Sequence, residues 1–246
     1  MLVDLNADVG EECGDDAALI PLLTSANVAC GGHAGDAAVM ARTVGLCTRH
    51  GVRIGAHVSY PDREHFGRRD MQLPAAELTA ELLRQIRALD TVARAAGARV
   101  TYLKAHGALY NRMADDPVVT DAVLGALKAF DPGLSLLTLP GSVAMKRARA
   151  MGIEPVGEAF ADRAYRDDGR LQPRGEPGAV ITDAQQVAAR GLRLAKQGRV
   201  ESVTGKSIAI EVRSLCVHGD TPGAVELARA LRAALQVAGV ELRAFT

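Results

Sequence analysis

Residues 2–12 read LVDLNADVGEE, an apolar run in which Asp4, Asn6 and Asp8 alternate with apolar residues before the chain turns acidic. A near-continuous apolar run of this kind is typical of a strand buried on both faces of a parallel sheet. The turn after it lacks the GxGxxG pattern of a dinucleotide-binding sheet. Because a buried carboxylate needs a partner or a chemical role, we expect this strand to lead into a functional site.

The rest of the chain alternates short apolar runs with longer segments of helical pattern. Further strands are predicted over residues 26–30, 52–57, 100–106, 134–140, 153–160 and 208–218, and helices over 37–50, 75–96, 118–130, 184–197 and 223–239. Capping residues support the helix boundaries, namely Asp36, Asp116, Asp183 and Thr221 at the starts and Gly51, Gly97 and Gly198 at the ends. About seven strand–helix units in a chain of this length predict one α/β domain, residues 1–246, folded as an irregular (β/α) barrel of parallel strands.

The composition argues against several classes of partner. Basic and acidic residues each number 29, so the formal net charge is zero, and only 3% of the residues are aromatic. This predicts no basic surface for nucleic acid or an anionic membrane, and few rings for stacking on bases. No apolar run approaches the roughly 20 residues of a membrane span, and the first residues do not resemble a signal peptide. The four cysteines form no CxxC pair and are interpreted as reduced thiols, so a cytoplasmic location is expected.

Polar residues gather where the predicted strands end. They are Asp4, Asn6, Asp8, Glu11, His33, Asp36, His57, Lys104, His106, Glu158, Asp162, His218 and Asp220. Because the carboxyl ends of parallel strands meet on one face of a barrel, we expect these side chains to converge on one site. Four of the six histidines fall at such ends, which makes this the strongest physical signal in the sequence.

Individual residues differ in how strongly they indicate a functional site. Lys104 lies inside an apolar strand, where an unpaired ammonium is costly, so it should meet a carboxylate or an anionic ligand. For Asp36, capping the following helix explains the residue as well as a site role does. Residues 166–168, Arg-Asp-Asp, are interpreted as a solvated loop.

Two familiar signals are rejected. TGKS at residues 204–207 resembles the end of a P-loop, but Val200 stands where a glycine is required, and a strand follows instead of a helix. There is no HExxH or other close histidine pair for a helix-borne zinc ion. A metal held by Asp8, His33 and His57 stays open, and no metal ligand is assigned.

Seven segments carry a shared pattern: DLNADVGEE, NVACGGHAGD, GAHVSYPD, HFGRRDM, LKAHGALYN, FADRAYRDDGRLQPRG and LCVHGDTPGA. In order and spacing they strongly resemble the LamB/YcsF family, from Asp4 to about Ala224. The resemblance implies a glycoside hydrolase/deacetylase-like barrel. It also implies the A subunit of an ATP-dependent 5-oxoprolinase, which with B and C subunits converts 5-oxo-L-proline, ATP and water to L-glutamate, ADP and phosphate. ATP, with Mg²⁺, is then a co-substrate, and no tightly bound metal is predicted.

The sequence departs from the family pattern at Gly32, Val58 and Ala105, where a phenylalanine and two prolines are expected. All three departures keep the neighbouring polar groups, so the implied chemistry is not contradicted. The backbone beside His57 and His106 has more freedom without the prolines.

The implied reaction suggests roles for the strand-end residues. Opening a stable lactam requires a cation for the oxyanion or phosphate, a base for water and an acid for the departing nitrogen. We expect Lys104 to be the cation, Asp8 or Glu158 to orient or activate water, and His106 and His218 to move protons. The expected substrate-binding residues are Asp4, Asn6, Glu11, His33, Asp36, His57, Asp162, Arg163 and Asp220.

Two other functions remain open at this point. One is a metal-dependent amide deacetylase on the same barrel, which would need an Asp/His metal site at the strand ends. The other is a non-catalytic subunit that binds the lactam while its partners handle ATP.

Overall fold

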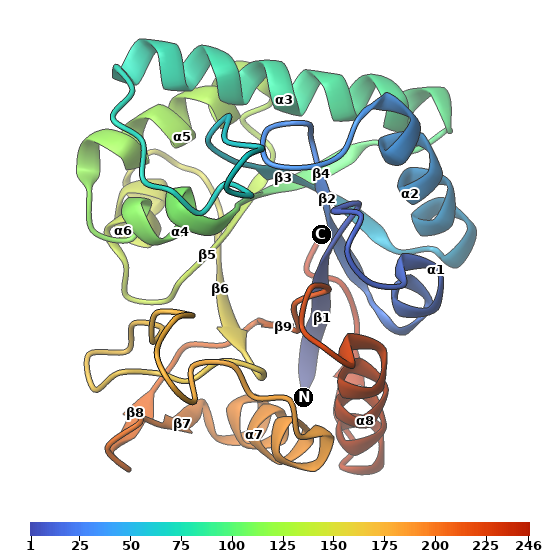
Figure 1. Ribbon diagram of the computed structural model, residues 1–246, viewed down its shortest axis with the longest axis vertical. Coiled ribbons are helices and arrows are strands. Elements are labelled where there is room, and N and C mark those ends of the chain that lie inside the picture. Colours follow the sequence, from blue (N-terminus) through green and yellow to red (C-terminus); the bar gives the residue numbers. More distant parts are fainter.

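Seven parallel strands close into a barrel in the computed structural model, which describes residues 1–246 (Figure 1). They are β1 (Leu2–Val9), β2 (Ser25–Ala29), β3 (Arg53–Val58), β4 (Val100–Ala105), β5 (Ser135–Thr138), β6 (Pro155–Phe160) and β9 (Ser214–Cys216). β9 pairs with both β6 and β1 and so closes the barrel. The short strand β10 (Glu241–Leu242) extends the sheet beside the first residues of β1. The predicted barrel of parallel strands is confirmed.

The predicted strand over residues 208–218 is wrong in its extent. Its first part belongs to β8 (Ser207–Ala209), which pairs with β7 (Arg199–Glu201) in an antiparallel hairpin outside the barrel. Only Ser214–Cys216 enters the barrel. The apolar residues of the first part alternate with exposed ones, which is the pattern of a ribbon buried on one face. Such alternation should have separated it from the fully buried strand β9.

Nine helical segments lie outside the barrel (Figure 1). They are α1 (Asp16–Leu19), η1 (Ile20–Leu22), α2 (Ala37–His50), α3 (Ala75–Ala95), α4 (Gly107–Met113), α5 (Pro117–Phe130), α6 (Val143–Ala150), α7 (Ala184–Gln197) and α8 (Ala224–Val237). The five predicted helices are confirmed within one or two residues. α7 and α8 pack closely at Gly191, where a Cβ atom would lie 2.2 Å from Leu231 Cδ1.

Three of the four caps predicted at helix starts are confirmed. The carboxylates of Asp36, Asp116 and Asp183 accept hydrogen bonds from backbone N–H groups in the first turns of α2, α5 and α7. The cap predicted at Thr221 is wrong, because Gly223 occupies the N-cap position of α8. The Thr221 hydroxyl instead donates to the buried carboxylate of Asp162 at 2.9 Å. A buried carboxylate needs donors more than an exposed helix end does.

The barrel axis is polar although the surrounding core is apolar. Asn27 donates from Nδ2 to Asn6 Oδ1 at 2.7 Å and to Asp8 Oδ1 at 2.8 Å, and its own Oδ1 accepts from Tyr102. A main core of 58 buried apolar residues packs around this column. None of the helices combines the length and the apolar character needed to cross a membrane. The fold therefore places a hydrogen-bonded polar column beneath the carboxyl ends of the strands.

Candidate active site

Lys104 is the centre of one buried group of side chains at the carboxyl ends of the strands. Its ammonium Nζ lies 2.9 Å from Asp8 Oδ1, 2.8 Å from Glu158 Oε1 and 3.2 Å from Cys216 Sγ. We call these four residues the lysine cluster. Burial alone would lower the pKa of Lys104, but Asp8 and Glu158 hold that pKa well above its usual value. The cluster therefore carries a permanent positive charge between two carboxylates.

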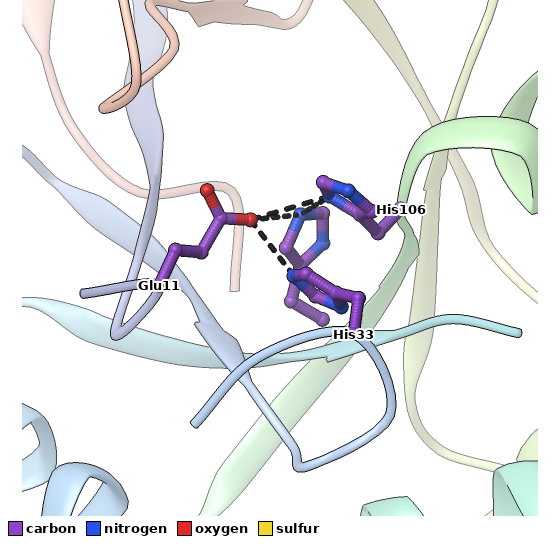
Figure 2. A group of neighbouring side chains, drawn as sticks. Glu11, His33 and His106 are labelled. Atoms are coloured by element: carbon purple, nitrogen blue, oxygen red, sulfur yellow. Dashed lines mark hydrogen bonds and ion pairs between the residues drawn. The ribbon is translucent and has the colours of Figure 1, made fainter. Parts of the chain in front are cut away.

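A second group, the histidine cluster, consists of Glu11, His33, His57 and His106. Figure 2 shows the Glu11 carboxylate directed toward His33 and His106. Glu11 Oε1 lies 2.9 Å from His33 Nε2, 3.5 Å from His57 Nε2 and 3.2 Å from His106 Nδ1. The rings of His33 and His106 stack in parallel with centroids 3.7 Å apart. The four residues come from four separate chain segments, and all are buried.

The loop at residues 62–68 shapes the histidine cluster. Phe66 sets its ring edge-on to both His33 and His106, with centroids 5.3 Å from each. At Gly67, which has φ +64°, a Cβ atom would lie 2.8 Å from His33 Cβ and 3.0 Å from His106 Cδ2. Only glycine combines this backbone conformation with the close approach to the stacked rings.

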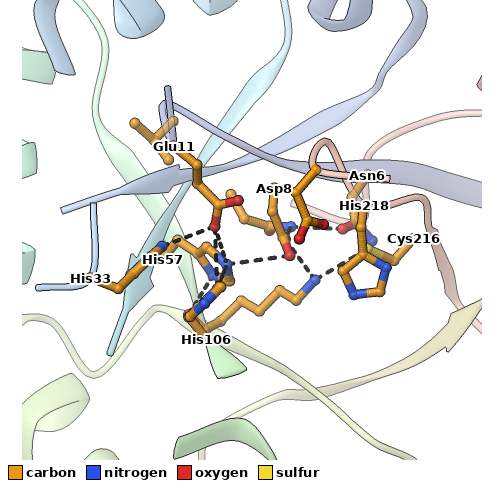
Figure 3. A network of polar contacts seen from close by, with 12 residues as sticks. Asn6, Asp8, Glu11, His33, His57, His106, Cys216 and His218 are labelled. Carbon is orange, nitrogen blue, oxygen red and sulfur yellow. Dashed lines mark hydrogen bonds and ion pairs between the residues drawn. The ribbon is translucent and has the colours of Figure 1, made fainter. Parts of the chain in front are cut away.

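Asp8 connects the two clusters (Figure 3). One carboxylate oxygen accepts from Lys104, and the other lies 3.4 Å from His57 Nε2. Burial alone would raise the pKa of Asp8, but His57 and Lys104 hold it well below its usual range. Burial also lowers the pKa of His33 to about 3, despite the neighbouring Glu11. Asp8 is therefore ionised, and His33 is neutral.

His218 and Asp162 form a hydrogen-bonded pair at the carboxyl end of the barrel. Asp162 accepts from His218 Nδ1 at 3.0 Å and also from the His218 backbone N–H and the Thr221 hydroxyl. Burial would raise the pKa of Asp162, but these contacts lower it. An ionised Asp162 fixes the proton on Nδ1 and leaves Nε2 of a neutral His218 as a proton acceptor.

A cavity of about 460 Å³ opens over these groups. Its lining includes Asp8, His57, Lys104, His106 and His218, together with the arginines Arg68, Arg163, Arg166, Arg170 and Arg174. Arg163 is buried and donates to the backbone carbonyls of Ala179 and Gln172. Burial lowers its pKa to about 10, so it remains a cation at neutral pH. The cavity thus combines proton-transfer groups with positive charge.

The structure brings most of the predicted site residues together. The predicted residues that line the cavity are Asp8, His57, Lys104, His106, Arg163 and His218. Four more are buried beside them, namely Glu11, His33, Glu158 and Asp162. Asp4 and Asn6 belong to the polar column and hydrogen-bond to Ser214. Asp220 pairs with Arg68 and Arg174. Asp36 stays apart as an exposed cap of α2.

The sequence analysis missed several residues of this site. Arg166, Arg170 and Arg174 lie in a stretch where residues 166–168 were interpreted as a solvated loop, and Cys216 was counted only as a free thiol. Arg166 and Arg170 do form ion pairs, with Glu176 and Asp115. Four arginines within residues 163–174 of a nearly neutral chain were a usable signal of an anion-binding wall.

Comparisons with known proteins agree with this description. The LamB/YcsF family model matches residues 3–246. The chain is 53% identical to the 5-oxoprolinase A subunit of Streptomyces avermitilis, covering 99% of this chain and 100% of that protein. It is 50% identical to the 5-oxoprolinase A subunit of Mycobacterium avium, covering 99% and 98% respectively.

Among solved structures, the lactam utilization protein of Thermus thermophilus superposes with a TM-score of 0.94 at 46% identity, over the full length of both chains. A family 4 carbohydrate esterase from Streptomyces lividans matches with a TM-score of 0.52 at 12% identity, covering 100% of this chain and 93% of that one. The second likeness concerns the barrel fold alone.

Proposed function

This chain belongs to the LamB/YcsF family, and we propose that it is the A subunit of an ATP-dependent 5-oxoprolinase, which opens 5-oxo-L-proline to L-glutamate. The full-length similarity to proteins named as the A subunit of 5-oxoprolinase supports the family of reactions. The observation that carries a catalytic role is the cavity in which Lys104, Asp8 and the His218–Asp162 pair face one space.

The cavity suits a small anionic lactam. Arg163 has no carboxylate within ion-pair distance, so its charge is available for the carboxylate of 5-oxoproline. Lys104 provides the positive charge near which an oxyanion or a phosphoryl oxygen can develop. Asp8 and Glu158 hold this charge in position before the substrate binds.

We assign proton transfer to the His218–Asp162 pair. With Nδ1 held by Asp162, Nε2 of His218 can take a proton from water and return it to the departing lactam nitrogen. Asp8 is ionised beside Lys104, so it is suited to orient water. His106 hydrogen-bonds through Nε2 to the carbonyl of Phe66, and its Nδ1 faces the histidine cluster. It is therefore a weaker candidate for proton transfer than the sequence suggested.

ATP enters this proposal as the reagent that activates the lactam carbonyl. Phosphorylation of the carbonyl oxygen would turn a poor electrophile into a good one. The chain has no P-loop, and the relatives are named as subunits, so we propose that turnover requires the B and C subunits with ATP and Mg²⁺. The alternative of a passive lactam-binding protein gives no role to a buried ammonium and a His–Asp pair in one cavity.

Reconstitution of the chain with its B and C subunits tests the proposal. Glutamate and phosphate should form together only when all three proteins and ATP are present. His218→Asn should lower kcat by roughly 10²-fold or more, whereas His50→Asn, on the exposed end of α2, should leave it unchanged. Equal turnover by the B and C subunits without this chain would overturn the proposal. Release of acetate from N-acetylated substrates, without lactam turnover, would favour the deacetylase.

A further inference from the structure

The histidine cluster has an unusual distribution of protons. A backbone carbonyl can only accept a hydrogen bond, so a ring nitrogen facing one must carry the proton. His106 Nε2 lies 2.9 Å from the carbonyl of Phe66, and His57 Nδ1 lies 3.3 Å from the carbonyl of Lys104. In the neutral rings, His106 Nδ1 and His57 Nε2 therefore present lone pairs.

These two lone pairs face each other. His106 Nδ1 and His57 Nε2 are 3.0 Å apart, and Glu11 Oε1 lies 3.2 Å from the first and 3.5 Å from the second. With both rings neutral, three acceptors would thus converge in a buried space with no proton between them. Such an arrangement is repulsive unless a positive charge occupies the centre, either a metal ion or a second proton on one of the rings.

His33 completes a set of four possible ligands. Its Nε2 lies 2.9 Å from Glu11 Oε1, and its Nδ1 is buried with no hydrogen-bond partner. One atom from each of Glu11, His33, His57 and His106 lies within 4.8 Å of the other three. A tetrahedral zinc site with bonds of about 2.05 Å separates its ligand atoms by about 3.3 Å, close to the 2.9–3.5 Å that separate Glu11 from the three histidines and His57 from His106.

We propose that Glu11, His33, His57 and His106 bind one divalent transition-metal ion of the zinc class. Three imidazoles and one carboxylate match the ligand preference of such ions better than that of Mg²⁺ or Ca²⁺. The carbonyls of Phe66 and Lys104 act as the outer hydrogen-bond acceptors that orient metal-binding histidines. This inference concerns binding and does not depend on the proposed reaction.

The neighbouring group Asp8, Cys216 and His218 also has the spacing of a metal site, but its positive charge is already present. Lys104 Nζ lies between Asp8 and Cys216, at 2.9 and 3.2 Å. An ammonium at this position repels a metal ion, so the proposal is confined to the histidine cluster.

Metal binding is measured on untagged protein stripped with a chelator and then titrated with Zn²⁺ or Co²⁺. Elemental analysis should give about one bound ion per chain, and Zn²⁺ should raise the melting temperature. Glu11→Gln and His106→Asn should weaken binding at least roughly a hundredfold, since even the loss of an outer-shell partner costs about 10–100-fold. His50→Asn, on the exposed end of α2, is the matched control and should bind as the wild type does.

A second measurement needs no variant. In ¹⁵N spectra of the imidazole rings, Zn²⁺ should perturb Nδ1 of His106 and Nε2 of His33 and His57, while His106 Nε2 and His57 Nδ1 keep their protons. The proposal is overturned if Zn²⁺ perturbs none of these nitrogens. It is also overturned if a doubly protonated ring fills the cluster with no metal bound, or if both variants bind as tightly as the wild type.

Discussion

The lysine cluster and the histidine cluster lie side by side and differ in how each offsets the charge of a buried carboxylate. Both bury carboxylates at the carboxyl ends of the strands, and Asp8 touches both. In the lysine cluster the compensating charge is part of the chain, since Lys104 is held by Asp8 and Glu158. In the histidine cluster the chain instead surrounds the Glu11 carboxylate with imidazole nitrogens. The first contains its own cation, and the second is the cluster where we propose that a metal ion binds.

Asp4 provides a third case within the same barrel. Its carboxylate accepts hydrogen bonds from the hydroxyls of Thr24, Ser25 and Ser214 and has no cation beside it. Burial raises its pKa to about 6 in spite of these donors. Neutral donors alone therefore do not offset the burial of a carboxylate, whereas His57 and Lys104 together do so for Asp8.

The largest expected effect is that of Lys104→Met, which removes the built-in cation. Asp8 and Glu158 are left buried without compensation, so the free energy of unfolding should fall by about 3–5 kcal/mol. In the reconstituted complex kcat should fall at least about a hundredfold. Denaturant unfolding and glutamate release are the measurements, with Lys128→Met on the exposed side of α5 as the control.

The double variant Lys104→Met/Glu158→Gln separates stability from catalysis. Removing one uncompensated charge should restore about 1 kcal/mol or more of stability without restoring kcat. If Lys104→Met had the same free energy of unfolding as the wild type, Lys104 would not be compensating the charges of Asp8 and Glu158.

A smaller effect is expected from Asp4, and it depends on pH. Its pKa is raised on folding, so between about pH 4 and 6 the folded state binds more protons than the unfolded state. The free energy of unfolding therefore loses up to about 3 kcal/mol as the pH rises through this range, and the loss persists above it. Asp4→Asn should remove this term.

The measurement is the difference in unfolding free energy between Asp4→Asn and the wild type at several pH values. That difference should move in favour of the variant from pH 4 to pH 7. A difference independent of pH would mean that the three hydroxyls compensate Asp4 as fully as His57 and Lys104 compensate Asp8.

The smallest effect is expected at the cavity wall. Arg174 is partly exposed and shares Asp220 with Arg68, so its charge is screened by solvent and by its partner. Arg174→Ala should raise KM for the lactam about threefold and leave kcat and stability nearly unchanged. Arg147→Ala, at a surface ion pair with Asp121, is the control. A large fall in kcat would instead mean that Arg174 acts in the chemical step, as we propose for the buried Lys104.

Much of the fold could be predicted from local pattern. The apolar runs at 26–30, 52–57 and 100–106 indicated buried parallel strands, and Asp36, Asp116 and Asp183 marked helix starts, because capping depends on residues close in sequence. Thr221 shows the limit of this reasoning. Its hydroxyl is drawn to Asp162, 59 residues away, and no local pattern reports that competition.

For the site, the sequence by itself determined which residues stand at the strand ends, and therefore that Lys104, Asp8 and four histidines would converge. Strand direction and barrel closure suffice for that conclusion. Only the tertiary structure decided the pairings: Lys104 with both Asp8 and Glu158, His218 with Asp162, and three histidines around Glu11. The physical reason is that ion pairs, tautomers and metal ligands depend on distances of a few tenths of an ångström between atoms far apart in the chain.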